Sequence, residues 1–346
     1  MVERGYGPEV HQALADMVDG YLFIAAWGIF PALMVMVLKS YLAALERTQV
    51  VLWITLLAGV ANVLANYAFI FGNWGAPELG VRGAAIASVT SHSVSLVAVV
   101  IYVLWKMPQH QMFVRLWRPD WEMLARVFRL GLPIGFTGLS EVGLFAASAV
   151  MMGWLGTVAL AAHGIALQLA SITFMVHLGI SNVATIRAGN AYGRRDPAHL
   201  ARGAITATVM SALVAVLTIF VFVMWPEPLI NLFMQRDEPA RDQILVIGVG
   251  LLAMASLFQL VDGAQAVALG ILRGVQDTTV PMILAGFSYW IVGMPVSYLL
   301  GFVFDLKGVG VWLGLVFGLG VAAILLNARF WGSVLKRLGP TDPAAA

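Results

Sequence analysis

Long runs of apolar residues, separated by short polar segments, recur along the whole chain. Each run has about 20 or more mostly apolar residues, the length that an α-helix needs to cross a bilayer. We therefore predict an all-α integral membrane protein with nine transmembrane helices. The predicted spans are residues 20–43, 50–72, 82–105, 130–154, 159–187, 204–226, 244–271, 281–303 and 309–333.

The polar segments predict how the chain is divided. Most are short and carry turn signals, such as "FGNWGAPELG" and "FDLKG". The longest, residues 106–129, is basic and contains two prolines. We interpret it as a cytoplasmic linker that contains an interfacial helix. It separates residues 1–105, with three spans, from residues 130–338, with six, and residues 339–346 are predicted to be a disordered tail.

Composition supports the membrane interpretation. Of the 346 residues, 60% are hydrophobic and only 11% are charged, whereas a soluble domain has about 25% charged residues. The net charge of +2 gives no reason to expect nucleic acid as a partner, and the absence of cysteine excludes disulfides and thiolate metal sites.

Lysine and arginine predict the orientation of the spans, because they collect on the cytoplasmic side. With residues 106–129 placed inside, fifteen of the 20 basic residues are cytoplasmic and five are external. This bias predicts a cytoplasmic C-terminus and an external N-terminus in the inner (plasma) membrane.

A weak internal repeat relates the two parts of the chain. Residues 41–72 parallel residues 271–301, since both pass from a helix end through a charged, threonine-containing turn into the next span. Parallel repeats of this kind occur in transporters. The symmetry predicts that the first three spans copy the last three, and that three further helices would precede residue 1.

Two acidic residues lie well inside predicted spans, Glu141 and Asp262. A buried carboxylate costs several kcal/mol unless it is neutralised, paired or hydrated. One interpretation is a protonated acid in a structural helix–helix hydrogen bond; the other is an ion or proton site. We find no lysine or arginine in mid-membrane, so the neutralising partner is expected to be mobile: H⁺, Na⁺ or a cationic substrate.

Other polar residues of the spans form a candidate cation shell or cavity lining. Their oxygen atoms suit Na⁺, but each is equally explained as a hydrogen bond between helices. Asn62 and Asn66 are four apart and share a helix face, where they either line a cavity or bond a neighbouring helix. The remaining candidates are Thr137, Gln168, Asn182, Gln259, Gln265, Ser288 and Tyr289.

Enzyme and cofactor motifs are not found in the sequence. It has no phosphate-binding G-x-x-x-x-G-K-[ST] loop, and "GLSE" is not a nucleophile elbow. His163 and His177 lie on one predicted helix, which does not support a haem held between two helices. We therefore expect neither catalysis nor a cofactor. The abundant methionine and aromatic residues suit ordinary packing, and also an adaptable cavity for flat organic cations.

Several segments together resemble the multidrug and toxic compound extrusion (MATE) transporters, particularly the NorM-like branch. They are "LKSYLAALERTQ", "NVLANYAFIFGNWGAPELGVRGAAIAS", "RLGLPIGFTGLSEVGLFAASAVMMGWLG", "FQLVDGAQAVALGILRGVQDTTVPM" and "YWIVGMPVSYLLG". The resemblance covers nearly the whole chain. It implies two lobes of six helices, of which this chain resembles helices four to twelve: a partial N-lobe and a complete C-lobe.

The resemblance also implies roles for single residues. Glu141 and Asp262 match acids that bind the coupling cation, Na⁺ or H⁺, in the C-lobe. Asn62 and Asn66 match fifth-helix positions that work with a first-helix aspartate, which this sequence does not contain. Phe258 departs from the pattern, because some relatives have tyrosine there.

The predicted function is cation-coupled antiport of drug-like organic cations across the bilayer by a monomer. One alternative is a lipid-linked glycan flippase of a related fold, which would need arginine or lysine in the cavity for the pyrophosphate. Another is an inactive fragment or membrane scaffold. Relative to the family, the first three helices are absent through either a misassigned start or a true truncation, and activity of the chain depends on which of the two applies.

Overall fold

The computed structural model describes residues 8–114, 118–235 and 239–338. Within these residues the secondary structure is helical, with no strand. Nine helical segments of this part of the chain are long and apolar enough to cross a membrane, which confirms the nine predicted spans. The predicted tail, residues 339–346, lies outside the described residues.

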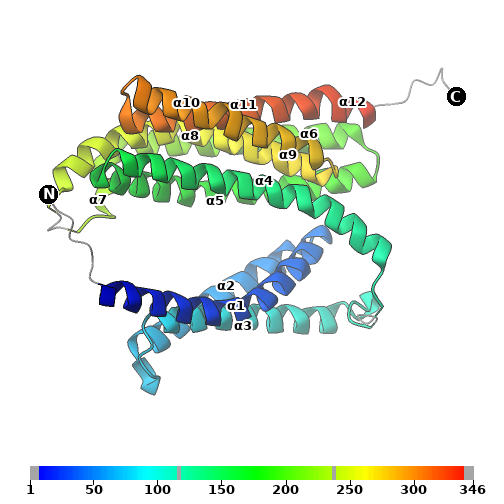
Figure 1. Cartoon of the computed structure of the whole chain (residues 1–346). Helices are drawn as coiled ribbons and strands as arrows, with labels where there is room; N and C mark the ends of the chain where they lie inside the picture. The colour runs from blue at the N-terminus through cyan, green and yellow to red at the C-terminus, as the bar shows by residue number, and fades with distance from the viewer. Residues whose placement is uncertain (1–7, 115–117, 236–238, 339–346) are drawn as a thin grey trace. The chain divides into compact units, whose positions relative to one another are not determined.

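The helices are connected mostly by tight turns (Figure 1). Their bounds are α1 (Pro8–Ala44), α2 (Thr48–Phe71), α3 (Val81–Lys106), α4 (Trp121–Trp154), α5 (Thr157–Gly193), α6 (Pro197–Met224), α7 (Pro226–Asn231), α8 (Arg241–Gly274), α9 (Thr279–Phe287), α10 (Met294–Tyr298), α11 (Lys307–Arg329) and α12 (Leu335–Leu338).

The chain divides into two compact units, residues 1–118 and 119–346. In the first unit, α3 packs against both α1 and α2. Their contact is closed by a small apolar core that includes Leu38, Leu42, Ile54 and Val99. Between membrane helices, side chains of this kind are held together by van der Waals packing rather than by the hydrophobic effect.

The second unit is organised around α8, which packs against α5, α6 and α11. Its most buried stretch runs from Phe258 to Leu272 and includes Asp262 and two glutamines. Small residues allow this close approach: a Cβ added at Gly270 would overlap the hydroxyl and carbonyl of Ser181 in α5. The central position of α8 therefore places its polar side chains inside the bundle, away from lipid.

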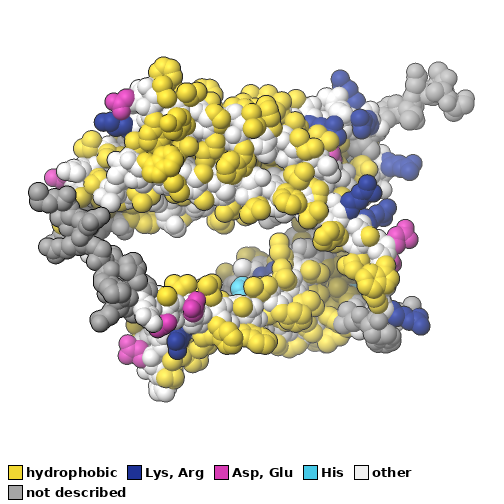
Figure 2. Space-filling view, in the orientation of Figure 1, with side chains coloured by type: hydrophobic (Ala, Val, Ile, Leu, Met, Phe, Trp, Pro, Cys, Tyr) yellow, Lys and Arg dark blue, Asp and Glu magenta, His cyan; other side chains and the backbone are white. Residues whose placement is uncertain are grey.

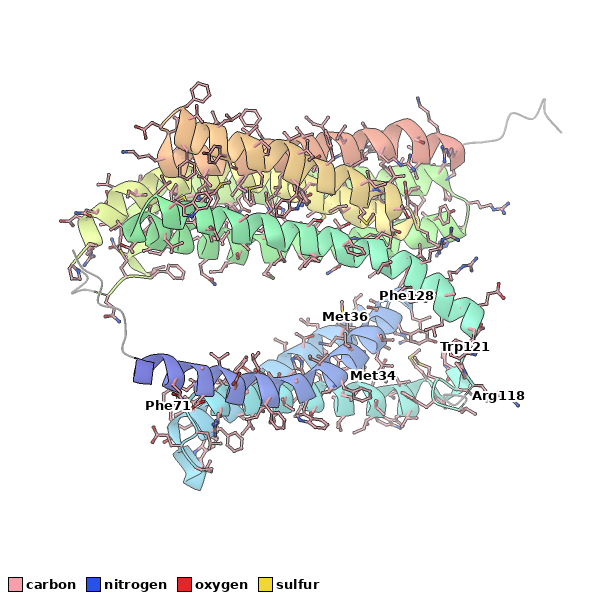
Figure 3. All side chains as sticks on the ribbon, in the orientation of Figure 1. Met34, Met36, Phe71, Arg118, Trp121 and Phe128 are labelled. Carbon is pink, nitrogen blue, oxygen red and sulfur yellow. The ribbon has the colours of Figure 1, made fainter. Side chains whose placement is uncertain are left out.

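Helix α4 begins earlier than the predicted span 130–154 and takes in the end of the predicted linker. It starts at Trp121, where the Asp120 side chain accepts a hydrogen bond of 3.0 Å from the backbone N–H of Met123 and so caps the helix. Trp121 and Phe128 project from these first turns (Figure 3) and are 72% and 67% exposed. The interfacial helix expected within residues 106–129 is thus, from Trp121 onwards, an extension of α4.

The eighth span is not a regular α-helix. Two π-helical turns, Ser288–Gly293 and Leu299–Val303, flank α10. Pro295, in the first turn of α10, lacks the N–H that would continue the regular hydrogen-bond ladder. π-helical turns often occur at functional sites, and the first of these two turns carries Ser288 and Tyr289.

The surface follows the same division between spans and ends. Hydrophobic side chains cover the flanks of the helices in Figure 2, and basic side chains gather near helix ends. Within the second unit, helices of alternating direction bring one set of basic residues to the same end. This set is Arg126, Arg129, Arg187, Arg194, Arg195, Arg202, Arg273, Arg329, Lys336 and Arg337.

Candidate functional site

The two intramembrane acids line one cavity in the second unit. Glu141 comes from α4 and Asp262 from α8, and the cavity between them and α5 has a volume of about 250 Å³. Its other walls are largely apolar and include Phe145, Phe174 and Phe258. The sequence placed the acids on different helices more than a hundred residues apart, and the fold brings them to one space.

Gln265 connects Glu141 with the π-helical turn. Its Nε2 atom donates a hydrogen bond of 3.1 Å to Oε1 of Glu141, and its Oε1 atom accepts a bond of 2.5 Å from the Tyr289 hydroxyl. Gln265 and Tyr289 are both fully buried. The Glu141 carboxylate is therefore linked to α8 and to the eighth span at once.

Two oxygen atoms beside this network find no hydrogen-bond partner among the described residues. They are Oδ1 of Asp262 and Oε1 of Gln259, on residues that are 2% and 0% exposed. The Nε2 atom of Gln259 is held by the Ala170 carbonyl at 3.2 Å. A buried acceptor without a partner is costly, so these two oxygens fit a ligand that carries positive charge or donates a hydrogen bond.

Among the described residues, Arg273 at the end of α8 is a positive side chain whose charge favours the ionised form of Glu141. Its guanidinium attracts the Glu141 carboxylate through space, while the one ion pair found among the described residues joins Arg329 to Asp277. Glu141 and Asp262 are thus without a fixed salt bridge in the described part of the chain.

Other predicted site residues are satisfied by their own helices or lie elsewhere. Thr137 and Ser288 are buried, and their hydroxyls donate to the carbonyls of Pro133 and Leu284 one turn earlier, at 2.8 and 2.7 Å. Gln168 and Asn182 are exposed on α5.

Asn62 and Asn66 lie in the first unit and bond each other and α3. Asn66 donates to Asn62 at 3.0 Å, and Asn62 donates to the Ala87 carbonyl at 3.4 Å.

The cavity also contains residues that sequence reasoning did not select. Phe145 and Phe174 are single aromatic residues in apolar spans, and only the three-dimensional arrangement shows that they face the acids. His177 does not line the cavity; it lies beside Gly263, the neighbour of Asp262, and its Nδ1 atom is 2.8 Å from the Ser211 hydroxyl.

Comparison with known proteins places this arrangement in a family. A family model described as MatE matches residues 133–299. A protein of Rhizobium meliloti (strain 1021) named "probable multidrug resistance protein NorM" is 42% identical over 99% of this chain and 72% of its own length. A protein of the same name from Synechocystis sp. is 35% identical over 92% of this chain and 70% of its own length.

Solved structures show the same fold. The crystal structure of a eukaryotic MATE transporter superposes with a TM-score of 0.81 at 18% identity, covering 92% of this chain and 69% of that one. An outward-facing MATE transporter gives a TM-score of 0.71 at 22% identity, over 81% of this chain and 61% of that one. With these structures and the NorM relatives in agreement, the chain belongs to the MATE family of membrane transporters.

Proposed function

We propose that this protein exports drug-like organic cations in exchange for Na⁺ or H⁺, and that Glu141 and Asp262 hold the coupling cation. The observation that carries the proposal is the cavity that both acids line, with the unpartnered Asp262 oxygen beside it. Two carboxylates in one low-dielectric space repel each other, and a bound cation removes that cost. The NorM names of the relatives support drug export.

The coupling follows from what a cation changes in the network. Without a cation, Glu141 is stabilised by the Gln265 amide and by the field of Arg273. A cation between Glu141 and Asp262 supplies that stabilisation instead and draws α4 and α8 together. Because Gln265 also holds Tyr289, the change reaches the π-helical turn. A cation that prefers one arrangement of these helices shifts the protein towards it, and the drug is released from that state.

In this proposal, residues 1–105 are the partial N-lobe, residues 106–129 the cytoplasmic linker and residues 130–338 the complete C-lobe. The chain spans 72% and 70% of the length of two NorM relatives, which fits one partial lobe beside a complete one. A flippase for lipid-linked glycans is disfavoured, because the described lining of the acidic cavity contains no arginine or lysine to hold a pyrophosphate.

The test is ethidium efflux from cells that lack their own drug pumps, with the Glu141→Gln and Asp262→Asn variants. Each removes the negative charge but keeps the size of the side chain, so we expect efflux to be lost at normal expression. Glu122→Gln is the control, because Glu122 lies on the same helix, exposed and outside the cavity. A fully active Glu141→Gln variant would contradict the coupling role.

The choice of ion is a separate measurement. The purified wild-type chain is reconstituted in vesicles, and ethidium transport is driven either by an imposed Na⁺ gradient or by an imposed pH gradient. Transport with one gradient alone identifies the coupling ion. If neither gradient drives ethidium transport, although incorporation of the protein is confirmed, the scaffold or inactive-fragment alternative is favoured.

A further inference from the structure

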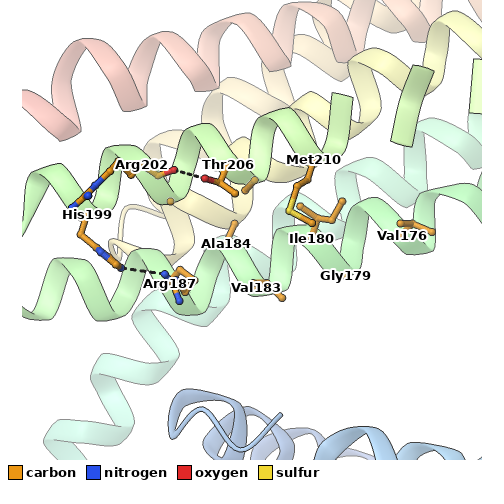
Figure 4. Close-up of a pocket in the computed structure, with 12 residues that line it drawn as sticks. Val176, Gly179, Ile180, Val183, Ala184, Arg187, His199, Arg202, Thr206 and Met210 are labelled. Atoms are coloured by element: carbon orange, nitrogen blue, oxygen red, sulfur yellow. Dashed lines mark hydrogen bonds between the residues drawn. The ribbon is translucent and has the colours of Figure 1, made fainter. Parts of the chain in front are cut away.

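A groove lies between α5 and α6, near the turn that joins them (Figure 4). Its volume is about 720 Å³. Apolar side chains line most of its length, and Val176, Val183 and Met210 are 49%, 57% and 52% exposed. An accessible apolar groove on a pair of membrane-spanning helices suits an apolar chain as its occupant.

One end of the groove is strongly basic. Arg187 of α5 and Arg202 and His199 of α6 meet there (Figure 4), and Arg187 lies 3.4 Å from the His199 Nε2 atom. Within the described residues, neither arginine has a carboxylate at ion-pair distance. The adjacent acid, Asp196, caps α6 by accepting 2.9 Å from the backbone N–H of His199. The positive charge at this end is therefore available to an anion.

The length of the groove matches one leaflet of a bilayer. From Val176 to Arg187 helix α5 rises about 16 Å, half of the roughly 30 Å hydrocarbon core. Arg187 is close to the end of α5, and Arg202 is close to the start of α6. The arginines therefore lie where lipid headgroups begin, and the apolar part lies at the depth of acyl chains.

Two glycines keep the groove open. A Cβ added to Gly179 of α5 or to Gly203 of α6 would meet no atom within 4 Å. Their missing side chains are thus not required for the two helices to approach each other, unlike Gly270 of α8. They leave room for a ligand.

We propose that this groove binds an anionic phospholipid, with its phosphate at Arg187, Arg202 and His199 and an acyl chain along α5 and α6. A guanidinium group can donate two parallel hydrogen bonds to the oxygens of one phosphate. Basic pockets between membrane spans bind anionic lipid headgroups. Only a molecule that is anionic at one end and apolar along the rest can contact both the basic end of the groove and its apolar length. None of these residues belongs to the Glu141–Asp262 cavity, so the site is independent of the proposed transport function.

Native mass spectrometry of the purified 346-residue chain tests this directly. The probe is dioleoylphosphatidylglycerol in equimolar mixture with dioleoylphosphatidylcholine, and we expect the wild type to retain the phosphatidylglycerol. The double variant Arg187→Gln/Arg202→Gln is expected to lose about 30-fold in phosphatidylglycerol affinity, because each arginine near a membrane surface contributes about fivefold. Arg126→Gln/Arg129→Gln removes the same charge from α4 and should leave binding unchanged.

A second pair of variants keeps both arginines and fills the groove instead. Gly179→Leu is expected to abolish retention of phosphatidylglycerol by occupying the path of the acyl chain. Gly164→Leu is the control, because Gly164 lies on the same helix, is equally open and does not line the groove. A thermal melt of each variant confirms folding.

Four results would overturn the proposal. The first is equal retention of both lipids by the wild type. The second is unchanged binding in the double arginine variant or in Gly179→Leu, and the third is an equal loss in the α4 control. The fourth is full displacement of the bound lipid when inorganic phosphate is added to the wild type. The last result would identify a site for free phosphate, in which the apolar groove has no role.

Discussion

At the scale of residues, the Tyr289 hydroxyl begins the series of hydrogen bonds that leads through Gln265 to Glu141. Its bond to the buried Gln265 oxygen fixes the amide so that the Nε2 donor faces the carboxylate. Tyr289→Phe would leave that oxygen without a donor, at a cost of about 1–3 kcal/mol. We expect the coupling-cation concentration for half-maximal efflux to rise about tenfold. The measurement is ethidium transport by reconstituted protein over a range of ion concentrations.

Tyr298→Phe provides the comparison for this variant. Tyr298 belongs to the same span, but it is 48% exposed and stacks on Phe302. Its hydroxyl has no part in the acidic cavity, so the ion dependence should stay at the wild-type value. If Tyr289→Phe also left the dependence unchanged, Gln265 would have to hold its orientation without the tyrosine.

Which polar residues face the cavity could be predicted only in part from the sequence. Glu141 and Asp262 were identifiable because an acid inside a span is costly, whatever its direction. Gln168 and Asn182 are exposed instead of facing the cavity. The direction of a side chain depends on how α5 is rotated about its axis, and a helix that is apolar all round has no polar face that would indicate this rotation. Thr137 is satisfied by its own backbone, an option that every threonine in a helix has.

At the scale of elements, the contact between α5 and α8 depends on small residues. Thr185 and Ser181 donate to the carbonyls of Gly270 and Ala266 at 2.8 and 2.6 Å. A Cβ at Gly270 would overlap Ser181, so Gly270→Ala must push the helices apart. Overpacking of this kind costs about 1–3 kcal/mol. We therefore expect a clearly lower melting temperature in detergent, measured by the loss of monodisperse protein on heating.

Gly164→Ala makes the same chemical change on α5 where there is space. A Cβ at Gly164 meets no atom within 4 Å, so its melting temperature should equal that of the wild type or exceed it slightly through better helix propensity. Equal melting temperatures for Gly270→Ala and Gly164→Ala would show that α5 and α8 adjust to the extra methyl group.

Helix existence was predictable for all nine spans, but helix ends were not. Residues 121–129 contain several charges and look like part of a linker, yet they form the start of α4 because Asp120 caps it. A hydropathy pattern detects the part of a helix that crosses lipid and not the part that extends beyond it. The π-helical turns of the eighth span lie inside its apolar run, so hydropathy does not distinguish them from the α-helical turns around them.

At the scale of the whole molecule, the distribution of charge predicts the orientation of the second unit in the membrane. One end of the second unit carries most of its basic residues, while Arg241 and Lys307 lie at opposite-end helix starts. The cytoplasmic side retains lysine and arginine, so the basic end is expected to face the cytoplasm. This orientation also determines which leaflet supplies the lipid for the α5–α6 groove.

Reporter fusions test this orientation. Green fluorescent protein joined after the last residue should fluoresce, and alkaline phosphatase at the same place should be inactive, because the C-terminus is predicted to be cytoplasmic. A fusion after Asp305, just before α11, should give the reverse pair of signals, since one span separates the two positions. Active phosphatase at the C-terminus and fluorescence after Asp305 would mean that the whole unit is inverted. The basic end, and with it Arg187 and Arg202, would then meet the outer leaflet.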